Sequence, residues 1–567
     1  MRICRLLLGL FLVAGLARAE SVTVSVLATT DLHGNIYAYD YYTARPAQRG
    51  LAKVATLIHA ARGENPNSIL IDCGDAIQGS PLESVYQQRI RTGRLPAGMK
   101  WEGPIPERDP MMAAMNALGY QAMVPGNHEF NFGVRNFENA RSDARFPWIS
   151  ANIQAQPGSP FKPFQPYLVL TSGGVKVALI GITTPNIPAW EPEENYKGLR
   201  FLDGADTARS TVEELRRKER PDVVIAAVHA GLGEDPGEKP RRTGRPPENM
   251  ALEIARRVPG IDAVIYGHSH QPEESRLANG VLLVQPRNWG GSLARLDFEF
   301  DKTAQGWKLK SKSSRLIPVQ AETVADPEIL RLAKPYHEMA VAYLNTPIAQ
   351  SAVELSGARG RIEDSALVDA IHEAQLHYTK ADVSFTSLFN PQVRVARGPV
   401  TVRQIAALYL YDNELYAIEG TGGMVKDALE NAARFFLSCR TEACDQGPLI
   451  NRSVLGYNFD MAQGVTYEID LTKPAGQRIV NLRWKGRPLE RDQRLRIAVN
   501  NYRAGGSGGY AMFRGARIVW RSNDDIRNLI VAYYMERRKL PEQPDDNWRI
   551  VPEGARRTLA AEAVSGR

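Results

Sequence analysis

Apolar runs that end in polar, glycine-rich turns recur through residues 22–319 of the chain. They fall at residues 22–30, 68–72, 177–182, 223–229 and 263–268. Segments compatible with helices lie between some of them, at 205–219 and 249–258. This alternation predicts an α/β layered domain, and open sheets of that kind usually place their sites on the loops that leave the strand ends.

The length of the chain requires more than one core. A domain usually has roughly 100–250 residues, and this chain has 567. Residues 326–344 begin with Asp326-Pro327-Glu328 and then carry apolar side chains at helical spacing, which predicts a linking helix. Those side chains are Ile329, Leu332, Tyr336, Met339 and Tyr343.

A second α/β unit is expected after this helix. It has helical patterns at 365–378 and 402–408, and strand patterns at 381–386, 464–471 and 494–500. We therefore divide the chain into a signal segment (1–19), a first domain (20–319), a linker helix (320–349), a second domain (350–554) and a frayed, polar tail (555–567).

The N-terminus has the features of a cleaved export signal. Arg2 and Arg5 precede an apolar run at residues 6–16, and Ala17-Arg18-Ala19 is a cleavage site of the small-x-small type. A short membrane anchor is the alternative, but the apolar run is brief and no cysteine closely follows it. We predict cleavage after Ala19 and a periplasmic location, since nothing in the sequence indicates a wall anchor.

The composition of the mature chain limits its partners. Hydrophobic residues make up 43% and charged residues 23% of the chain, as in ordinary soluble proteins. No stretch of 18 apolar residues follows the signal, so no membrane span is expected. Loss of the signal lowers the formal charge from +7 to +4. This mild, dispersed excess suits a small anionic substrate and argues against a nucleic acid polymer. The expected state is a monomer.

Three cysteines remain after removal of the signal. Cys439 and Cys444 lie five residues apart in a polar stretch, which predicts a local disulfide in an oxidising compartment. Cys73 follows an apolar run and is expected to be a buried, unpaired small hydrophobe. A zinc site made of cysteines is not supported.

Five of the nine histidines lie in strand-end motifs of the first half. In chain order the motifs are Asp31-x-His33, Gly-Asp75, Gly-Asn127-His128-Glu, a strand that ends in His229, and Gly-His268-x-His270. Each histidine alone is more typical of an ordinary polar loop, but the ordered set indicates a metal site. Residues i and i+2 that leave a strand can both turn toward one site.

The donor types limit the metal and suggest the chemistry. Carboxylate, imidazole and amide donors suit Mn²⁺, Zn²⁺, Fe or Co²⁺, whereas an all-oxygen cage suits Mg²⁺ or Ca²⁺. Two metals roughly 3.5–4 Å apart share a bridging carboxylate, lower the pKa of a bridging water and clamp phosphoryl oxygens. The motifs therefore predict a phosphoesterase with two divalent metal ions.

These motifs resemble those of the calcineurin-like metallophosphoesterases, and more narrowly those of the bacterial periplasmic 5′-nucleotidase and cyclic-nucleotide phosphodiesterase family. The resemblance covers nearly the whole mature chain, including Gln78-Gly79-Ser80-Pro81, Trp289-Gly290 and the second domain. It implies an N-terminal four-layer β-sandwich flanked by helices, a linking helix and a C-terminal α/β substrate domain.

The resemblance also implies roles for the site residues. One metal would take Asp31, His33, Asp75 and His270, and the other would take Asp75, Asn127, His229 and His268, with Asp75 bridging. His128 would not bind metal but would stabilise the transition state and assist the departing oxygen as a general acid. The expected catalytic residues are therefore His128 and the ligand Asn127.

Two positions favour the branch with 2′,3′-cyclic phosphodiesterase and 3′-nucleotidase activity. Relatives that resemble the 5′-nucleotidase branch have an aspartate three residues after the catalytic histidine, where this chain has Asn131. That branch also tends to end the last motif in glutamine, where this chain has His270. An amide can hold the imidazole, but it cannot stabilise an imidazolium as a carboxylate would.

The second domain has two aromatic segments that could bind a base. The glycine-rich segment 500–510 contains Tyr502, and segment 456–460 contains Tyr457 and Phe459. Stacking of a ring on a base gains about 1–3 kcal/mol, although a flexible turn with a core tyrosine is the alternative. Both segments, and residues 408–413, resemble the cyclic phosphodiesterase branch. That resemblance implies a base held between Tyr457 and Tyr502, with Phe459 as the alternative to Tyr457.

We expect a hydrolase of nucleoside 2′,3′-cyclic phosphates and 3′-nucleotides that uses a hydroxide activated by two metals. A 5′-nucleotidase or nucleotide-sugar hydrolase is the alternative within the family, and a thiosulfate-ester hydrolase is a third option within the fold. From another class, the chain could be a non-catalytic nucleotide-binding surface protein. His128 beside a full ligand set speaks against that class.

Overall fold

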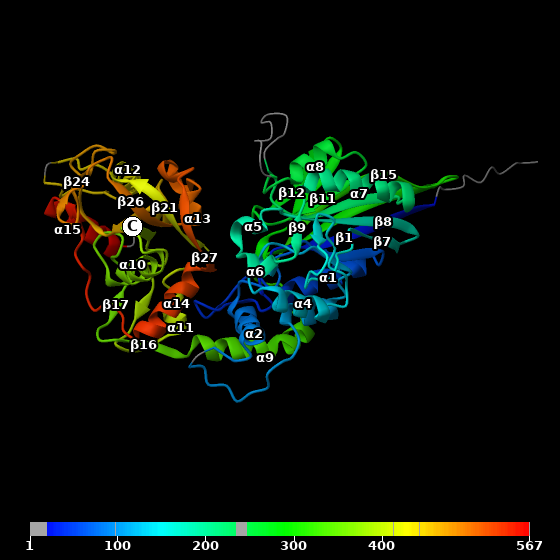
Figure 1. Ribbon diagram of the computed structural model, residues 1–567, viewed down its shortest axis with the longest axis horizontal. Helices are drawn as coiled ribbons and strands as arrows, with labels where there is room; N and C mark the ends of the chain where they lie inside the picture. The colour runs from blue at the N-terminus through cyan, green and yellow to red at the C-terminus, as the bar shows by residue number, and fades with distance from the viewer. Residues whose placement is uncertain (1–19, 97, 234–245, 412, 442, 566–567) are drawn as a thin grey trace, which may run out of the picture.

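The computed structural model describes residues 20–96, 98–233, 246–411, 413–441 and 443–565. The predicted export signal, residues 1–19, lies outside the described residues. The described residues form two lobes, and α9 (Pro327–Leu344) runs between them along the bottom of Figure 1. The first lobe is coloured blue to green in that view and the second yellow-green to red.

Two sheets form the centre of the first lobe. One has the order β15 (Gly306–Pro318), β14 (Ser292–Thr303), β1 (Ser21–Thr29), β4 (Ser68–Asp72) and β5 (Ala122–Met123). The other has the order β12 (Glu273–Ala278), β13 (Val281–Gln285), β11 (Ala263–Tyr266), β10 (Val223–His229), β8 (Val175–Thr183) and β7 (Tyr167–Ser172).

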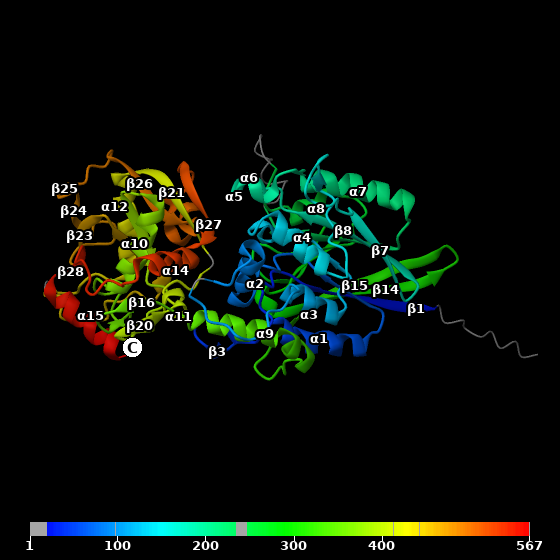
Figure 2. The ribbon, with the colours of Figure 1, turned by 60° about the horizontal axis from the view of Figure 1, so that its bottom comes forward.

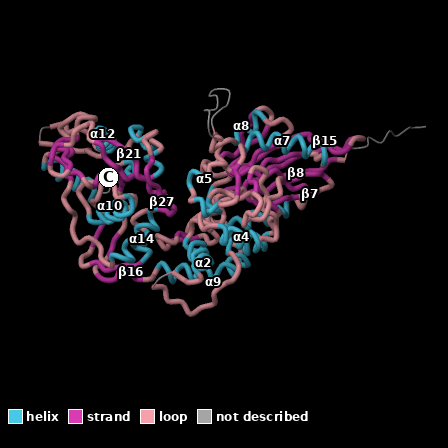
Figure 3. Tube along the Cα trace, viewed as in Figure 1, coloured by secondary structure: helices cyan, strands magenta, loops and turns pink. Residues whose placement is uncertain are grey.

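The two sheets pack face to face and are covered by helices on both outer sides. Val24 and Ile71 of one sheet share a buried core with Leu179 and Ile225 of the other. The outer face of the first sheet packs on α1 (Leu51–Glu64), α2 (Pro81–Thr92) and α3 (Pro110–Leu118), and that of the second on α7 (Gly204–Lys218) and α8 (Ala251–Arg257). Figure 3 shows the strands inside this lobe with helices outside them. The predicted four-layer sandwich is confirmed.

Parallel pairing brings the functional loops to one edge. Strands β1, β4 and β5 are parallel neighbours, as are β8, β10 and β11. The carboxyl ends of parallel neighbours lie at the same edge of a sheet. The turns that follow β1 and β4 therefore lie side by side, as do the turns that follow β10 and β11.

Helix α9 begins as predicted from the sequence. The side chain of Asp326 accepts hydrogen bonds from the backbone N–H groups of Glu328 (2.9 Å) and Ile329 (3.0 Å) and so caps the helix. Tyr336 and Met339 are buried, in agreement with the predicted apolar face. The helix packs against α2 and α3, as Figure 2 also shows, so its apolar face belongs to the first lobe.

The second lobe is built on a mixed sheet with helices on both faces. Its order is β22 (Asp460–Gln463), β18 (Val383–Ser387), β26 (Arg494–Asn500), β21 (Glu414–Thr421) and β27 (Ile518–Asp525). Its main helices are α10 (Ala366–Thr379), α11 (Val402–Ala406), α12 (Gly422–Ala432) and α14 (Ile526–Arg537). A smaller sheet has the order β25 (Arg487–Pro488), β24 (Ile479–Trp484), β23 (Val465–Asp470) and β28 (Trp548–Val551).

The predicted frayed tail is wrong over most of its length. Residues Glu553–Ser565 form α15, and Ala555 and Leu559 are buried against the second lobe. The Glu562 carboxylate accepts a hydrogen bond from the backbone N–H of Leu449 (2.7 Å). The small side chains that suggest a tail are also good helix formers, and two of them are spaced to pack on one face.

The cysteines agree with the sequence analysis. Cys439 and Cys444 form a disulfide, and Cys73 is buried and free. The disulfide closes a local loop beside α15, since the hydroxyl of Thr558 donates to the carbonyl of Cys444 (3.0 Å). Among the described residues, no helix has both the length and the apolar character needed to cross a membrane.

Candidate functional site

The turns that carry the predicted ligands have an unusual backbone. Asp31, His33, Asp75, His268 and His270 all adopt left-handed φ values, between 48° and 70°. Such residues each store about 1–3 kcal/mol of strain, and they cluster at functional sites. Hydrogen bonds between turns hold them: the N–H of Asp31 donates to Gly74 O and that of His33 to Asp75 O, both at 2.8 Å. The strand-end turns therefore fix one another.

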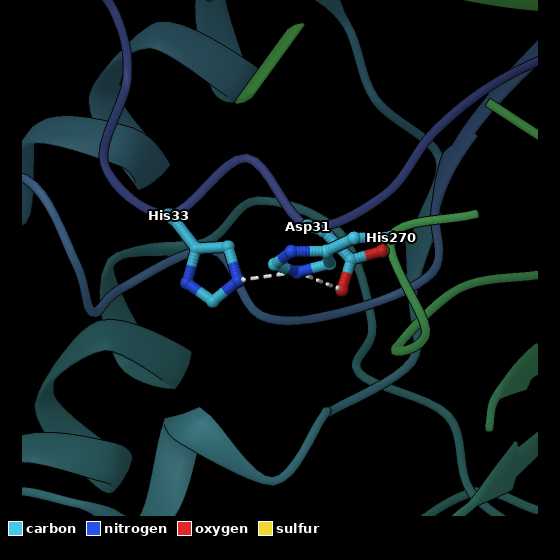
Figure 4. Close-up of side chains that lie close together, drawn as sticks. All are labelled: Asp31, His33 and His270. Carbon is cyan, nitrogen blue, oxygen red and sulfur yellow. Dashed lines mark hydrogen bonds and ion pairs between the residues drawn. The ribbon is translucent and has the colours of Figure 1, made fainter. Parts of the chain in front are cut away.

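Six of the seven predicted ligands form two clusters of side chains. Asp31, His33 and His270 make the first, shown in Figure 4, and Asp75, His229 and His268 make the second. Within each cluster one donor atom per residue lies within 4.8 Å of the others. In the first cluster, His270 Nε2 lies 3.2 Å from His33 Nε2 and 3.4 Å from Asp31 Oδ1.

Asp75, a member of the second cluster, also lies near the first. Its Oδ2 is 3.1 Å from His229 Nε2 and 3.9 Å from His33 Nε2. Asn127, the seventh predicted ligand, has its Oδ1 3.1 Å from His229 Nε2. A carboxylate in this position is within reach of both donor groups, as a bridging ligand requires. The converging nitrogen and oxygen donors fit a pair of divalent metal ions, but they do not select among Mn²⁺, Zn²⁺, Fe and Co²⁺.

Burial and the charges of neighbouring ligands strongly shift the pKa values of the candidate ligands. Burial alone would raise the pKa of Asp31, but the hydrogen bond and charge of His270 lower it to about 2. Burial lowers the pKa of His33 to about 4. For His229 the effect of burial is outweighed by the charge of Asp75, which raises its pKa to about 10. Such closely coupled groups are typical of functional sites.

Two glycines allow the turns that carry the candidate ligands to pack closely together. A Cβ atom on Gly126 would lie 2.2 Å from Asp75 Oδ1, and one on Gly267 would lie 2.0 Å from Thr30 Oγ1. Either contact would displace the Asp75 or Asp31 turn. The glycines of the Gly-Asn-His-Glu and Gly-His-x-His motifs are therefore required by space at the site.

His128 lies at the edge of the donor clusters. Its ring is 5.2 Å from the ring of His33, and its backbone N–H donates to Asp75 Oδ1 (2.8 Å). Its Nδ1 lies 2.7 Å from Asn131 Oδ1. Burial alone would lower the pKa of His128, but the charge of Asp75 and the Asn131 bond raise it to about 9.

Two carboxylates at the site, Glu129 and Glu191, had no role predicted from the sequence. The buried Glu129 carboxylate accepts backbone hydrogen bonds from Asp75 (2.9 Å), Ala76 (2.6 Å) and Gly126 (2.6 Å), so it ties two ligand turns together. Glu129 is the last residue of the Gly-Asn-His-Glu motif, and this position could have indicated a role at the site. Glu191 accepts a hydrogen bond from Asn131 Nδ2 (2.5 Å), and no local pattern marks it.

The aromatic residues of the second lobe differ in exposure. Tyr502 is 45% exposed and Tyr457 is partly exposed, whereas Phe459 is 1% exposed and packs against Phe435 and Trp548. The assignment of Phe459 to base binding is therefore wrong, because neither face of its ring is open. Phe459 is part of the hydrophobic core of the second lobe.

Tyr411, in the segment 408–413, was not predicted as a base-binding residue. It is 43% exposed, and its ring centroid lies 6.2 Å from that of Tyr457. Partial burial and the nearby phenol groups of Tyr457 and Tyr502 raise its pKa. The three tyrosines thus lie close to one another on the second lobe, although they come from distant segments.

A cavity between the lobes adjoins the first cluster. It has a volume of about 210 Å³, and its walls include His33, Arg49 and Trp289 of the first lobe and Leu410 and Arg527 of the second. Leu410 immediately precedes Tyr411. The aromatic segment of the second lobe therefore approaches the candidate metal ligands of the first.

Comparison with known proteins covers both lobes. Residues 24–272 match the calcineurin-like phosphoesterase family, and residues 347–515 match the 5′-nucleotidase C-terminal domain. A 2′,3′-cyclic-nucleotide 2′-phosphodiesterase/3′-nucleotidase of Yersinia enterocolitica is 30% identical, with 96% of this chain and 90% of that protein aligned. The chain belongs to the bacterial 5′-nucleotidase and 2′,3′-cyclic-nucleotide 2′-phosphodiesterase family.

Other proteins are similar to this chain over different lengths. The trifunctional nucleotide phosphoesterase protein YfkN of Bacillus subtilis is 29% identical over 94% of this chain, but the chain spans only 39% of that protein. The solved NAD nucleotidase of Haemophilus influenzae has a TM-score of 0.61 at 19% identity and covers 94% of this chain and 100% of its own. At that identity the likeness shows the fold alone.

Membership of this family confirms the predicted resemblance, the two-domain α/β fold and the enzyme class. The chain is a hydrolase of the metallophosphoesterase class, and the family implies divalent metal ions. Among the described residues, the two donor clusters could hold such ions with both carboxylate and imidazole donors, whereas a third group, Asp364, Asp369 and Asp545, offers carboxylates alone.

Proposed function

We propose that the protein is an exported hydrolase of nucleoside 2′,3′-cyclic phosphates and 3′-nucleotides. The observation that carries this proposal is the pair of donor clusters around Asp75 with His128 held at their edge by Asn131. The substrate class is supported by two relatives that are each a 2′,3′-cyclic-nucleotide 2′-phosphodiesterase/3′-nucleotidase. Both are about 30% identical to this chain over most of its length. The Cys439–Cys444 disulfide supports export, since disulfides persist in oxidising compartments.

The residues of the two clusters would hold two metal ions. Asp31, His33 and His270 would bind one, His229, His268 and Asn127 the other, and Asp75 would bridge them. Bound metals of this kind supply Lewis acidity, a hydroxide nucleophile at neutral pH, and charge that stabilises the phosphoryl transition state.

His128 would act on the leaving group. Asn131 Oδ1 accepts a hydrogen bond from Nδ1–H, which leaves Nε2–H to give its proton to the departing ribose oxygen as the bond from phosphorus to that oxygen breaks. A pKa of about 9 keeps the ring protonated near neutral pH, as a general acid requires.

The second lobe would select the nucleoside. Tyr502 with Tyr457 or Tyr411 offers exposed rings for stacking on a base, and every base has a face that can stack. Selectivity among bases is therefore expected to be weak, and bond specificity would come from the first lobe.

A substrate panel tests the proposal. The purified protein with Mn²⁺ is offered 2′,3′-cyclic AMP, 3′-AMP and 5′-AMP, and phosphate or nucleotide release is followed. The cyclic and 3′ substrates are expected to be hydrolysed preferentially. Preference for 5′-AMP would instead assign the chain to the 5′-nucleotidase alternative. No metal-dependent release of p-nitrophenol from bis(p-nitrophenyl) phosphate would favour a nucleotide-binding protein without activity.

The role of His128 is tested by its alanine variant. His128→Ala is expected to retain two bound metal ions and to lose about 10²–10⁴-fold in kcat. Metal content is measured by elemental analysis after dialysis. Loss of one metal ion from the variant would identify His128 as a ligand and contradict its role as the acid.

A further inference from the structure

Each imidazole of the donor clusters has one ring nitrogen close to a group outside its cluster, and which nitrogen this is differs among the histidines. His33 Nδ1 lies 2.9 Å from the carbonyl oxygen of Gln78, and His229 Nδ1 lies 2.7 Å from that of Cys73. A carbonyl only accepts, so Nδ1 donates in both rings, and Nε2 is the nitrogen left for a metal ion. In both rings Nε2 is the nitrogen that faces Asp75.

His270 has the same orientation. Its Nε2 faces Asp31 and His33, while its Nδ1 lies on the other side, 3.3 Å from Asn288 Nδ2. Three of the four candidate histidine ligands therefore present Nε2 to the site.

His268 is the exception. Its Nε2 lies 2.9 Å from Glu248 Oε1, and a carboxylate accepts a hydrogen bond but does not donate one. The proton of His268 is therefore on Nε2, and Nδ1 is the nitrogen with a free lone pair. The ring of Trp190 lies 5.6 Å from that of His268 at an angle of 30°, which limits rotation of the imidazole.

Glu248 lies outside the donor cluster itself. Among the residues that the structure describes, the cluster that contains His268 has only Asp75 and His229 as its other members. The backbone of Glu248 is fixed by a hydrogen bond, because the Glu248 carbonyl accepts from Thr184 Oγ1 (3.1 Å). The next residue, Asn249, accepts from the N–H of Gly231, two residues after His229 (2.7 Å). Glu248 is thus anchored to strand ends of the same sheet.

We infer that Glu248 is a positioning residue for the second metal site: it holds the proton of His268 on Nε2 so that Nδ1 binds the metal. This inference rests on the two-metal site of the proposed function. A carboxylate behind a metal-binding histidine fixes its tautomer and orientation and raises its basicity, and removal of such a partner typically weakens metal affinity 10–100-fold.

Metal titration of two variants tests this role. The apo forms of the wild type, Glu248→Ala and Glu248→Gln are titrated with Zn²⁺, and the number of sites and their affinities are measured. Glu248→Ala is expected to bind two ions, one of them 10–100-fold more weakly than the wild type does. Glu248→Gln is expected to stay close to the wild type, because its amide oxygen can accept the same bond from Nε2–H. The control is Glu274→Ala, an exposed glutamate on β12.

Two outcomes overturn the inference. Unchanged affinity in Glu248→Ala would show that His268 needs no such partner. Binding of a single ion by both Glu248 variants at saturating Zn²⁺ would show that Glu248 is itself a ligand. Co²⁺-loaded samples give a second readout, since the visible absorption bands of one site are expected to change in Glu248→Ala and to be restored in Glu248→Gln. A wild type that binds no metal would refute the proposed function instead.

Discussion

At the scale of single residues, the site is organised by uncharged and charged acceptors that hold imidazoles in place. Asn131 Oδ1 holds His128, a backbone carbonyl holds His229, and Glu248 holds His268. For His128 the acceptor is an amide, which stabilises an imidazolium less than a carboxylate would. Although burial alone would lower the pKa of His128, the charge of Asp75 and the hydrogen bond to Asn131 together raise it.

Exchange of Asn131 for aspartate is expected to raise the pKa of His128. Because the acid must be protonated, the alkaline limb of kcat/KM against pH is expected to move upward by about one pH unit, which equals about 1.4 kcal/mol. The exchange is made in a Glu191→Gln background, since Glu191 lies 2.5 Å from the Asn131 side chain and two carboxylates would share a proton there. Glu191→Gln alone is the control, and an alkaline limb that does not move would argue against His128 as the acid.

At the scale of secondary-structure elements, two buried carboxyl groups join α2 to the start of α3. Gln87 Nε2 donates to Glu83 Oε1 (2.7 Å) and to Asp109 Oδ2 (2.8 Å). Burial raises the pKa of Glu83 well above its usual value and that of Asp109 to about 6. The folded protein therefore binds protons here more tightly than the unfolded chain does.

This pair predicts a dependence of stability on pH. A carboxyl group whose pKa is raised by folding contributes fully below its unfolded pKa, and the contribution is lost as the pH rises through the folded value. The free energy of unfolding is thus expected to fall as the pH rises from about 4 through 6. Glu83→Gln is expected to reduce this fall and to stabilise the protein at pH 8 by about 1–3 kcal/mol.

Denaturant unfolding at pH 5 and pH 8 measures the effect of Glu83→Gln. Glu102→Gln, which replaces an exposed glutamate, is the matched control. An equal loss of stability with pH in the wild type and in Glu83→Gln would show that Glu83 is not protonated in the folded protein.

Helix α15 gives a second prediction at this scale. Leu559 is buried, so Leu559→Ala is expected to lower the free energy of unfolding of the second lobe by about 2–5 kcal/mol. Arg557→Ala, on the exposed face of the same helix, is expected to change it by less than about 0.5 kcal/mol. Equal and small effects in thermal unfolding would mean that the helix does not pack on the lobe.

At the scale of the whole molecule, Arg527 links the two lobes. Its guanidinium donates to the carbonyls of Tyr409 and Leu410 (both 2.9 Å) and to the Tyr42 hydroxyl (2.6 Å), and it lies 4.1 Å from the centre of the Tyr42 ring. Arg403 also donates to the carbonyl of Tyr41. The segment that leads to Tyr411 is therefore held by the same side chain that contacts the first lobe.

Tyr42→Ala is expected to separate nucleotide binding from bond cleavage. It removes a hydrogen bond to a charged donor and a cation–π contact, so kcat/KM for 3′-AMP is expected to fall by about tenfold, or about 1.4 kcal/mol. Turnover of bis(p-nitrophenyl) phosphate, which needs only the first lobe, is expected to stay unchanged. Tyr42→Phe keeps the ring and should lose less. Equal losses for both substrates would indicate damage to the first lobe.

The sequence alone determined the bond-breaking chemistry. The candidate ligands Asp31, His33, His268 and His270 are recognisable because they lie two residues apart at the ends of apolar runs, and a strand end fixes where such neighbours point. The Cys439–Cys444 disulfide is equally local. The layered fold could be predicted because strand-like and helix-like spacings of apolar residues alternate along the chain. Each spacing arises because a strand or helix buries one of its faces.

Only the tertiary structure decided which residues surround that chemistry. The burial of Phe459, the exposure of Tyr411 beside Tyr457, and the packing of α15 each depend on contacts between segments remote in the chain. The Glu248–His268 contact is of the same kind, because a glutamate in a loop has no local signal for the ring it will meet. Short-range spacing follows from backbone geometry, whereas side-chain partners across the fold follow from packing, and packing is decided by the whole chain at once.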